Sequence, residues 1–295
     1  MKSLRDAMAE TAAAIDNELE QIIPKDTGPL GNLMASLRYS TIGGGKRLRP
    51  FLTMQTAFLF SVPRTQALCV ATATELVHCY SLVHDDLPAM DNDDLRRGKP
   101  TNHKIFGDGL AILAGDGLLT LAFATLNGGK SGIEAGVRSQ LTLELANAAG
   151  INGMIGGQAI DLQTQHRPMN SLDIRHLQKL KTGALICFAV DAGAVLGCAT
   201  TEQRDALKGY ANSLGSAFQI VDDLLDMEGD TAKVGKKLRK DTAAGKATLV
   251  GSLGVEQARR EAHEMTKQAL HYLERFDDKA ELLREVTQFL LLRNH

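Results

Sequence analysis

Apolar residues recur at helical spacing along most of this chain. The first stripe predicts an amphipathic helix that ends at Pro24, and it consists of Leu4, Met8, Ile15, Leu19, Ile22 and Ile23. Groups of glycine, proline and small polar residues then interrupt the pattern at intervals suited to helices. No segment alternates with the two-residue period of a strand over several turns, and no hairpin signal is apparent. The pattern predicts an all-α protein.

The composition supports helix packing and a single domain. Aromatic residues make up only 4% of the chain and tryptophan is absent, so the core must come mainly from Ala, Leu, Ile, Val, Met and Gly. Composition does not shift along the sequence, and no internal repeat is visible. We therefore expect one domain over residues 1–295, built as a single large bundle of ten or more helices.

Charge and cysteine usage exclude several classes of protein. The 33 basic and 35 acidic residues nearly cancel, which argues against a nucleic-acid binder. The four cysteines form no Cys-x-x-Cys pair and are predicted to be reduced, buried side chains of a cytoplasmic protein. The first residues lack the apolar core of a signal peptide. The longest apolar stretch, Ala184–Thr200, is interrupted by Asp191, so we expect a core helix there and predict that no segment is long enough to span a membrane.

An acidic cluster carries the strongest chemical signal. An apolar helix from about Ala67 ends at Asp85 and Asp86, and Pro88 stops it. Three more acids follow at once, namely Asp91, Asp93 and Asp94. Acids this close repel one another, and at a helix C-terminus they also oppose the macrodipole. Magnesium prefers such oxygen ligands and binds one or two carboxylates together with substrate phosphates.

A second cluster repeats the theme far along the chain. Asp222 and Asp226 lie four residues apart and therefore share one helix face, with Asp223 between them. Two such clusters could hold several divalent cations, and a diphosphate could bridge those cations because its oxygens share the metal charge.

Basic residues precede the first cluster. Gly43–Pro50 is a glycine-rich turn leading into a helix, with Pro50 expected at the first helical position. Its backbone N–H groups, beside Lys46, Arg47 and Arg49, suit a second, metal-free diphosphate. The turn is not a P-loop, because its Gly-Lys is followed by Arg47 in place of Ser or Thr.

His78 lies two helical turns before Asp85 on nearly the same face, which favours a polar substrate contact over a core histidine. Together with Glu75 it also resembles the Glu-x-x-His element of di-iron bundles, but that fold needs two such elements and the sequence offers one.

Several segments together resemble the trans-isoprenyl diphosphate synthases, and most of all the bacterial farnesyl diphosphate synthases. They are Gly43–Pro50, His84–Gly98, Leu113–Asp116, Gly156–Gln158, Lys181–Gly183 and Gln219–Asp226. The resemblance covers essentially the whole chain. It implies a helical bundle around a central cavity, a homodimer, and Mg²⁺ as the cofactor, with three ions in each active site.

The resemblance also implies residue roles. The metal ligands are Asp85, Asp91 and Asp222, with Asp86 and Asp226 as supports. The residues implied to contact the allylic diphosphate are Arg96, Lys181 and Lys236, and those implied to hold isopentenyl diphosphate are Lys46, Arg49, His78 and Arg97. Thr182 and Gln219 are expected near the allylic carbon. Lys246 supplies a further cation, although Leu249-Val250 departs from the family pattern that follows it and leaves its reach open.

The implied reaction condenses isopentenyl diphosphate with dimethylallyl and then geranyl diphosphate. Tyr80 and Ser81, five and four residues before Asp85, are the expected determinants of product length. An aromatic residue at position 80 with the two extra residues between Asp86 and Asp91 goes, in this family, with a C15 product. A geranylgeranyl (C20) synthase remains an alternative, as does a core role for Tyr80.

Other classes of protein fit less well. Terpene cyclases share the first motif, but their second motif normally mixes Asn, Ser or Thr and Glu, unlike Asp222-Asp223-Leu-Leu-Asp226. A non-catalytic subunit of a heteromeric synthase usually lacks one or both aspartate motifs, and both are intact in this chain.

Overall fold

The computed structural model describes residues 2–25, 28–129, 131–165, 167–228 and 248–292. The chain divides into two compact units, residues 1–54 with 63–142 and residues 55–62 with 143–295. We describe each unit by itself. The single domain expected from the sequence stays a prediction.

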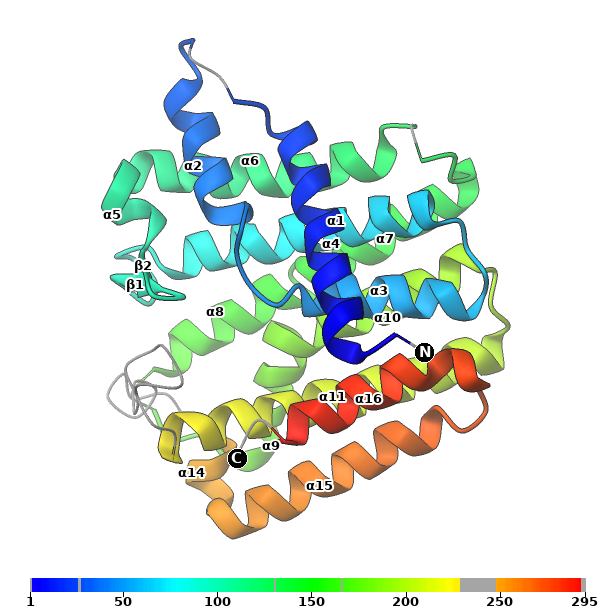
Figure 1. Cartoon of the computed structure of the whole chain (residues 1–295). Helices are drawn as coiled ribbons and strands as arrows, with labels where there is room; N and C mark the ends of the chain where they lie inside the picture. The colour runs from blue at the N-terminus through cyan, green and yellow to red at the C-terminus, as the bar shows by residue number, and fades with distance from the viewer. Residues whose placement is uncertain (1, 26–27, 130, 166, 229–247, 293–295) are drawn as a thin grey trace. The chain divides into compact units, whose positions relative to one another are not determined.

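The expected fold class is confirmed, because helices account for nearly all regular structure of the described residues (Figure 1). The first unit contains α1 (Leu4–Ile22), α2 (Gly31–Thr41), the start of α3 (Leu48–Leu59), α4 (Arg64–Asp85), β1 (Leu95–Arg96), β2 (Lys99–Pro100), α5 (Asn102–Phe106), α6 (Asp108–Asn127) and the start of α7 (Ala135–Ala149). Pro50 is the third residue of α3 and not the first as expected, but the first turn of a helix needs no N–H donor at either place.

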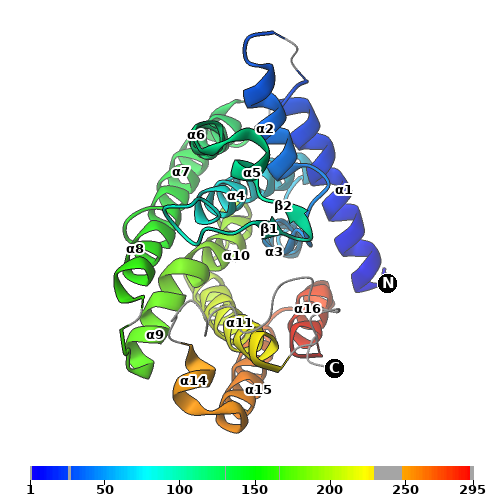
Figure 2. The same ribbon diagram turned by 90° about the vertical axis from the view of Figure 1, so that its left-hand side faces the viewer.

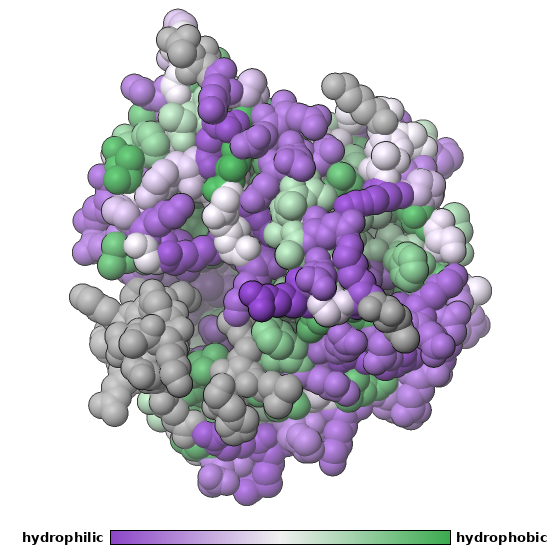
Figure 3. All heavy atoms as spheres, viewed as in Figure 1, coloured by the Kyte–Doolittle hydropathy of each residue, from purple (hydrophilic) through white to green (hydrophobic). Residues whose placement is uncertain are grey.

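The first helix follows its sequence pattern with a small rotation. Its buried residues are Ala7, Thr11, Ile15 and Leu19, at strict four-residue spacing. Ser3 caps the helix, since its hydroxyl accepts a hydrogen bond from the Asp6 N–H at 3.2 Å. On the face shown in Figure 3, the exposed side chains of α1 are mostly hydrophilic, with the exposed Ala9 and Ala13 among them.

The centre of the first unit is α4. Its buried residues run on all sides from Ala67 to Val83, because α1, α2 and α6 all pack against it. Figures 1 and 2 both show α6 alongside α4 and α2 near them. A helix that is apolar all round must be enclosed. Its two ends are less buried: Arg64 and Thr65 are exposed in the first turn, and the last turn ends at the half-buried Asp85.

A short hairpin follows α4, and the sequence did not predict it. Leu95 pairs with Pro100 and Arg96 with Lys99, which leaves Arg97 and Gly98 as the two loop residues. Their φ angles are +54° and +76°, as a two-residue hairpin loop of type I′ requires. The signal was missed because Arg97 stands where Asn or Asp is usual.

The second unit contains the remaining helices. They are α8 (Met154–Thr164), α9 (Ser171–Gln178), the π-helical turn η1 (Lys179–Gly183), α10 (Ala184–Leu196), α11 (Thr201–Glu228), α14 (Leu249–Leu253), α15 (Val255–Tyr272), the 3₁₀ turn η2 (Asp278–Ala280) and α16 (Glu281–Leu292). The longest, α11, packs against α10, α15 and α16 (Figures 1 and 2). The core helix expected at Ala184–Thr200 is confirmed, because α10 is buried along almost its whole length.

One helix contradicts the prediction that no segment is long enough to cross a membrane. Helix α6 spans 20 residues with a mean hydropathy of 1.7, and 33% of its most apolar window is buried. Among the described residues it is the only helix that passes this test of length and composition, which core helices of soluble proteins also pass. Ile112 and Leu113 lie on its exposed side.

Candidate active site

The first acidic cluster is organised by one ion pair. Asp85 is the last residue of α4, and Asp86 follows it with only 3% of its surface exposed. The Arg96 guanidinium from β1 binds the Asp86 carboxylate through Nη2 at 2.5 Å and Nε at 3.1 Å. Burial opposes the charged form of Arg96, but the hydrogen bonds and charges of the aspartates outweigh it and raise its pKa. Asp86 therefore fastens the hairpin to the end of α4.

The loop between Asp86 and the hairpin folds back on the helix end. The Asp91 N–H donates to the Asp85 carbonyl at 2.9 Å, and the Asp93 N–H donates to the Asp86 carbonyl at 3.2 Å. The backbone of Asp91 thus lies beside Asp85, and both residues are half-buried. The structure brings together these two predicted metal ligands. Because Asp86 already pairs with Arg96, its placement favours the supporting role that the resemblance implies.

The glycine-rich turn receives the second arginine of the hairpin. Gly45 has a φ of +81°, and a Cβ added there would lie 2.5 Å from Arg97 Cζ. Glycine is therefore required both by the backbone and by the approach of the guanidinium. A cavity of about 250 Å³ opens among the turn, the hairpin and α4, and Arg97 lines it together with Asp86 and Arg96. Lys46, Arg49 and His78 are not among its lining residues, so this cavity does not unite the expected isopentenyl diphosphate ligands.

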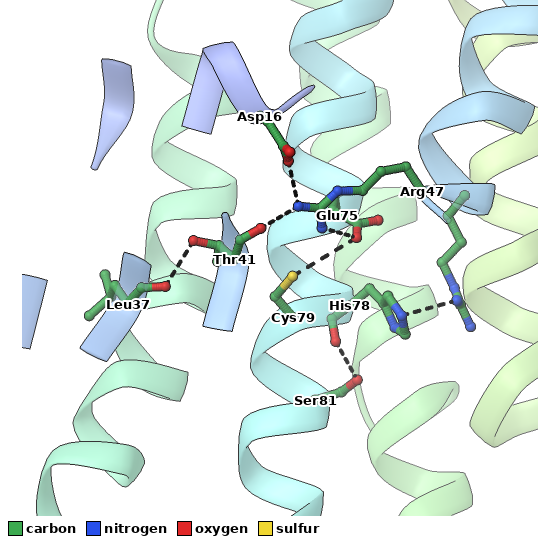
Figure 4. Close-up of polar contacts among 9 residues, drawn as sticks. Asp16, Leu37, Thr41, Arg47, Glu75, His78, Cys79 and Ser81 are labelled. Atoms are coloured by element: carbon green, nitrogen blue, oxygen red, sulfur yellow. Dashed lines mark hydrogen bonds and ion pairs between the residues drawn. The ribbon is translucent and has the colours of Figure 1, made fainter. Parts of the chain in front are cut away.

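Arg47, which the sequence places among the diphosphate-binding cations, is instead buried. Its guanidinium donates to Glu75 Oε1 at 2.7 Å, to Asp16 Oδ1 at 2.6 Å and to the Thr41 carbonyl. Figure 4 shows Arg47 directed toward these three residues. Its φ of +48° is strained for a non-glycine residue, at a cost of about 1–3 kcal/mol, and the three partners hold it there. Glu75 is thereby occupied by an arginine, which removes the support for a di-iron site.

Arg49 and His78 form a second contact, one helical turn along α4 from Glu75. Arg49 Nη1 lies 3.5 Å from His78 Nε2, and Figure 4 shows His78 turned away from the Arg47 group. Burial first, and then the charges of Arg49 and Arg97, hold the pKa of His78 well below its usual range. The ring is therefore neutral at physiological pH and accepts a hydrogen bond from Arg49.

Tyr80 and Ser81 occupy the turn of α4 before the aspartates. Tyr80 is 5% exposed and meets His84 edge to face, with 5.8 Å between ring centroids. Its hydroxyl is buried and has no hydrogen-bond partner among the described residues. Burial, and then the charge of Asp85, raise the pKa of Tyr80 to about 12. Ser81 donates its hydroxyl proton to the His78 carbonyl at 2.8 Å.

In the second unit, the acids of the second cluster divide in a similar way. Asp222 is exposed on α11, and Asp226 is half-buried one turn later. Asp223 faces inward, where its Oδ2 accepts hydrogen bonds from Gln178 Nε2 at 3.2 Å and from the Leu249 N–H at 3.1 Å. Asp223 thus joins α9 and α14 to α11.

The predicted residues Lys181 and Thr182 lie in η1 and contact two different helices. Lys181 Nζ lies 2.7 Å from Asp161 Oδ2 on α8. The Thr182 hydroxyl donates to Gln219 Oε1 on α11 at 3.3 Å, so this expected pair is brought together. Lys236 and Lys246 lie outside the described residues. Leu249, where the sequence departs from the family pattern, begins α14, and the Thr248 hydroxyl caps that helix.

The donor set fits magnesium carried in by a substrate. No three His, Cys, Asp or Glu side chains converge on a possible metal position within the described parts of the chain. Magnesium usually takes one or two protein carboxylates and completes its shell with water and phosphate oxygens. Asp85 and Asp91 offer such oxygens in the first unit, and Asp222 and Asp226 offer them in the second.

Two polar residues of α8, Gln158 and Asp161, were given no role in the sequence analysis. Asp161 binds the Lys181 ammonium, and Gln158 has both amide atoms buried with no partner among the described residues. The available signal was the Gly156–Gln158 motif, which the resemblance noted without giving it a role.

Comparison with known proteins places the chain in a family. The polyprenyl synthetase family model matches residues 31–289. Farnesyl diphosphate synthase from Geobacillus stearothermophilus is 39% identical over 294 residues, with 99% of both chains covered. Geranylgeranyl pyrophosphate synthase 3 from Arabidopsis thaliana is 38% identical over 98% of this chain and 81% of its own length. A crystal structure of an FPP/GFPP synthase from Zymomonas mobilis is 45% identical, covers 97% of this chain and 98% of that chain, and has a TM-score of 0.90.

This protein therefore belongs to the polyprenyl synthetase family. It is a trans-prenyl synthase by family, as the aspartate motifs indicated.

The neutral His78 makes stability depend on pH. Its folded pKa lies below the unfolded value of about 6.5, so below that pH the unfolded chain binds a proton that the native protein does not. Stability is therefore lost as pH falls from 7 toward 5, by up to about 1.4 kcal/mol for each pH unit. In urea unfolding at several pH values, His78→Gln should show a smaller loss than the unmodified protein.

The matched control is His263→Gln, because His263 lies exposed on α15. Its unfolding free energies at the same pH values are the reference for the His78→Gln profile. Parallel profiles for His78→Gln and the unmodified protein would show that His78 is not held neutral.

Proposed function

We propose that this protein is a magnesium-dependent farnesyl diphosphate synthase, which joins isopentenyl diphosphate to dimethylallyl and then geranyl diphosphate. The observation that carries the proposal is the division of each Asp-Asp pair. Asp86 and Asp223 accept hydrogen bonds from neighbouring segments of the fold, while the half-buried Asp85 ends α4 and Asp222 is exposed on α11. The curated relatives named farnesyl diphosphate synthase support the same activity.

Asp85, Asp91 and Asp222, supported by Asp226, would hold three magnesium ions together with the allylic diphosphate. When bound, magnesium neutralises the leaving diphosphate and so favours cleavage of the allylic C–O bond. The protein's part is to present carboxylates at fixed helix ends. Asp86 contributes indirectly, since it fixes the loop that carries Asp91.

The chain's own cations complete the charge balance. We assign Arg96, Lys181 and Lys236 to the allylic diphosphate, and Lys46, Arg49, His78 and Arg97 to isopentenyl diphosphate, with Lys246 as a further cation. A neutral His78 acts as an acceptor that orients Arg49 and not as a charge. Placed cations stabilise the negative charge that develops on the departing diphosphate.

The bond changes need no dedicated protein base. The allylic C–O bond breaks, and its electron pair leaves with diphosphate. The alkene of isopentenyl diphosphate attacks the allylic cation to form a C–C bond, and the released diphosphate takes the proton that is then lost. Thr182 and Gln219, which bind each other, are assigned a place near the cationic carbon.

Tyr80 is proposed as the limit on chain growth. Its buried ring lies one turn before Asp85, and its hydroxyl is not tied to another described residue, so the ring's bulk is what it offers. This favours a C15 product over the C20 product named for some relatives.

We also propose that the protein is a cytoplasmic homodimer. The four cysteines form no disulfide, as in a reducing compartment, although only Cys79 is buried and the prediction that all four are buried was wrong. Ile112 and Leu113, 45% and 53% exposed on α6, give the second copy an apolar surface to cover.

The assay for this function supplies dimethylallyl and labelled isopentenyl diphosphate and measures the products by chain length. We expect mainly C15 product with Mg²⁺, none after chelation, and a fall of roughly 10³-fold or more for Asp85→Ala, because the leaving group loses its charge stabilisation. Activity that survives chelation would contradict the metal assignment. No product under any condition would favour a non-catalytic subunit.

Replacement of Tyr80 tests the limit on product length. Tyr80→Ala removes the ring and should shift the product from C15 to C20 and longer. The matched control is Tyr80→Phe, which keeps the ring and removes a hydroxyl that has no hydrogen-bond partner among the described residues, so it should keep the C15 product. Unchanged chain length in Tyr80→Ala would exclude this residue as the limit.

A further inference from the structure

Lys181 sits in the one π-helical turn of the described chain. This turn, η1 (Lys179–Gly183), joins the end of α9 directly to the start of α10. Such single-turn π segments inside α-helices recur at functional sites, because the extra residue re-aims the side chains within it. In this turn Thr182 contacts α11, and Lys181 contacts α8.

On α8, Asp161 receives the Lys181 ammonium. The two charged atoms lie 2.7 Å apart, and the Lys181 and Asp161 side chains are 22% and 11% exposed. A lysine side chain is a flexible stem with about 2 kcal/mol of rotamer entropy, so its head has no fixed place without a partner. Asp161 supplies that partner from a neighbouring helix.

A glycine on the same face of α8 makes this contact possible. Gly157 precedes Asp161 by one helical turn, and a Cβ added to it would lie 2.3 Å from Lys181 N and 2.6 Å from Lys181 Cα. Any larger residue would push α8 away from η1. The two helices therefore touch backbone to backbone at Gly157, and the Asp161 carboxylate reaches Nζ because of that approach.

We propose that Asp161 is a positioning residue for Lys181, and that Gly157 sets the helix separation at which it acts. The proposal rests on the proposed function, in which Lys181 binds the allylic diphosphate. An ammonium has three N–H donors. One of them binds Asp161 and fixes the head group, and the other two remain for diphosphate oxygens. A cation already held in place stabilises the departing diphosphate without reorganising during the reaction.

The test is a double-mutant cycle of Asp161→Ala and Lys181→Ala, with kcat and KM for each substrate. Asp161→Ala alone should lower kcat/KM for dimethylallyl diphosphate roughly 10- to 100-fold, as a misplaced binding group does. It should leave the KM for isopentenyl diphosphate unchanged. In the Lys181→Ala background, Asp161→Ala should lower kcat/KM for dimethylallyl diphosphate by less than about two-fold, because the ammonium that Asp161 positions is absent.

Asp191→Ala is the matched control. Asp191 also lies in the second unit, its side chain is 11% exposed like that of Asp161, and it pairs with Arg204 at 2.6 Å. It should lower the unfolding temperature and leave kcat/KM within about two-fold. Equal losses from Asp161→Ala in both Lys181 backgrounds, or a loss no larger than that of Asp191→Ala, would overturn the proposal.

Two further measurements separate the role of Asp161 from the proposed function. Gly157→Ala changes neither charged group, yet it should reproduce the loss in kcat/KM for dimethylallyl diphosphate, and normal kinetics in this variant would contradict the assigned geometry. Calorimetric binding of inorganic diphosphate with Mg²⁺ gives a second cycle that needs no turnover. If the unmodified protein makes no product, the proposed function fails, while coupling in this binding cycle still decides the role of Asp161.

Discussion

The ion pair between Asp86 and Arg96 determines how the first unit presents its charges. It joins the end of α4 to the hairpin, so the intervening loop returns to the helix and brings the Asp91 backbone beside Asp85. The next hairpin residue, Arg97, is thereby set against Gly45. Breaking a buried pair of this kind typically costs about 3–5 kcal/mol, because one charge is left without a partner. Asp86 therefore orders the loop that carries Asp91, and its own carboxylate is paired with Arg96.

The second cluster reaches the same division with different partners. Asp223 is held by an amide N–H from Gln178 and the backbone N–H of Leu249, and Asp222 beside it is exposed. In both motifs the second aspartate of the pair binds neighbouring segments, while the first is half-buried at the end of α4 (Asp85) or exposed on α11 (Asp222). Among the cations, Arg47 likewise binds within the fold, between Lys46 in the glycine-rich turn and Arg49 at the start of α3.

How far the sequence predicted this structure depended on the range of each interaction. Periodicity was enough for the helices, and the Asp222–Asp226 spacing was enough for a shared face. The Arg97-Gly98 hairpin was missed because an arginine occupies a left-handed position. The burial of Arg47 could not be read locally, because its partners Asp16 and Glu75 are distant in sequence. Asp161 was missed for the same reason, since only packing at Gly157 brings it to Lys181.

The most direct test of this division compares two neighbouring residues, Asp222→Asn and Asp223→Asn, by urea unfolding with and without Mg²⁺ and inorganic diphosphate. We predict that Asp223→Asn loses about 1–3 kcal/mol of stability and is still stabilised by the ligand. Asp222→Asn should stay within about 0.5 kcal/mol of the unmodified protein and lose the stabilisation by the ligand. The opposite result, an unstable Asp222→Asn or an Asp223→Asn variant that no longer responds to the ligand, would contradict the account.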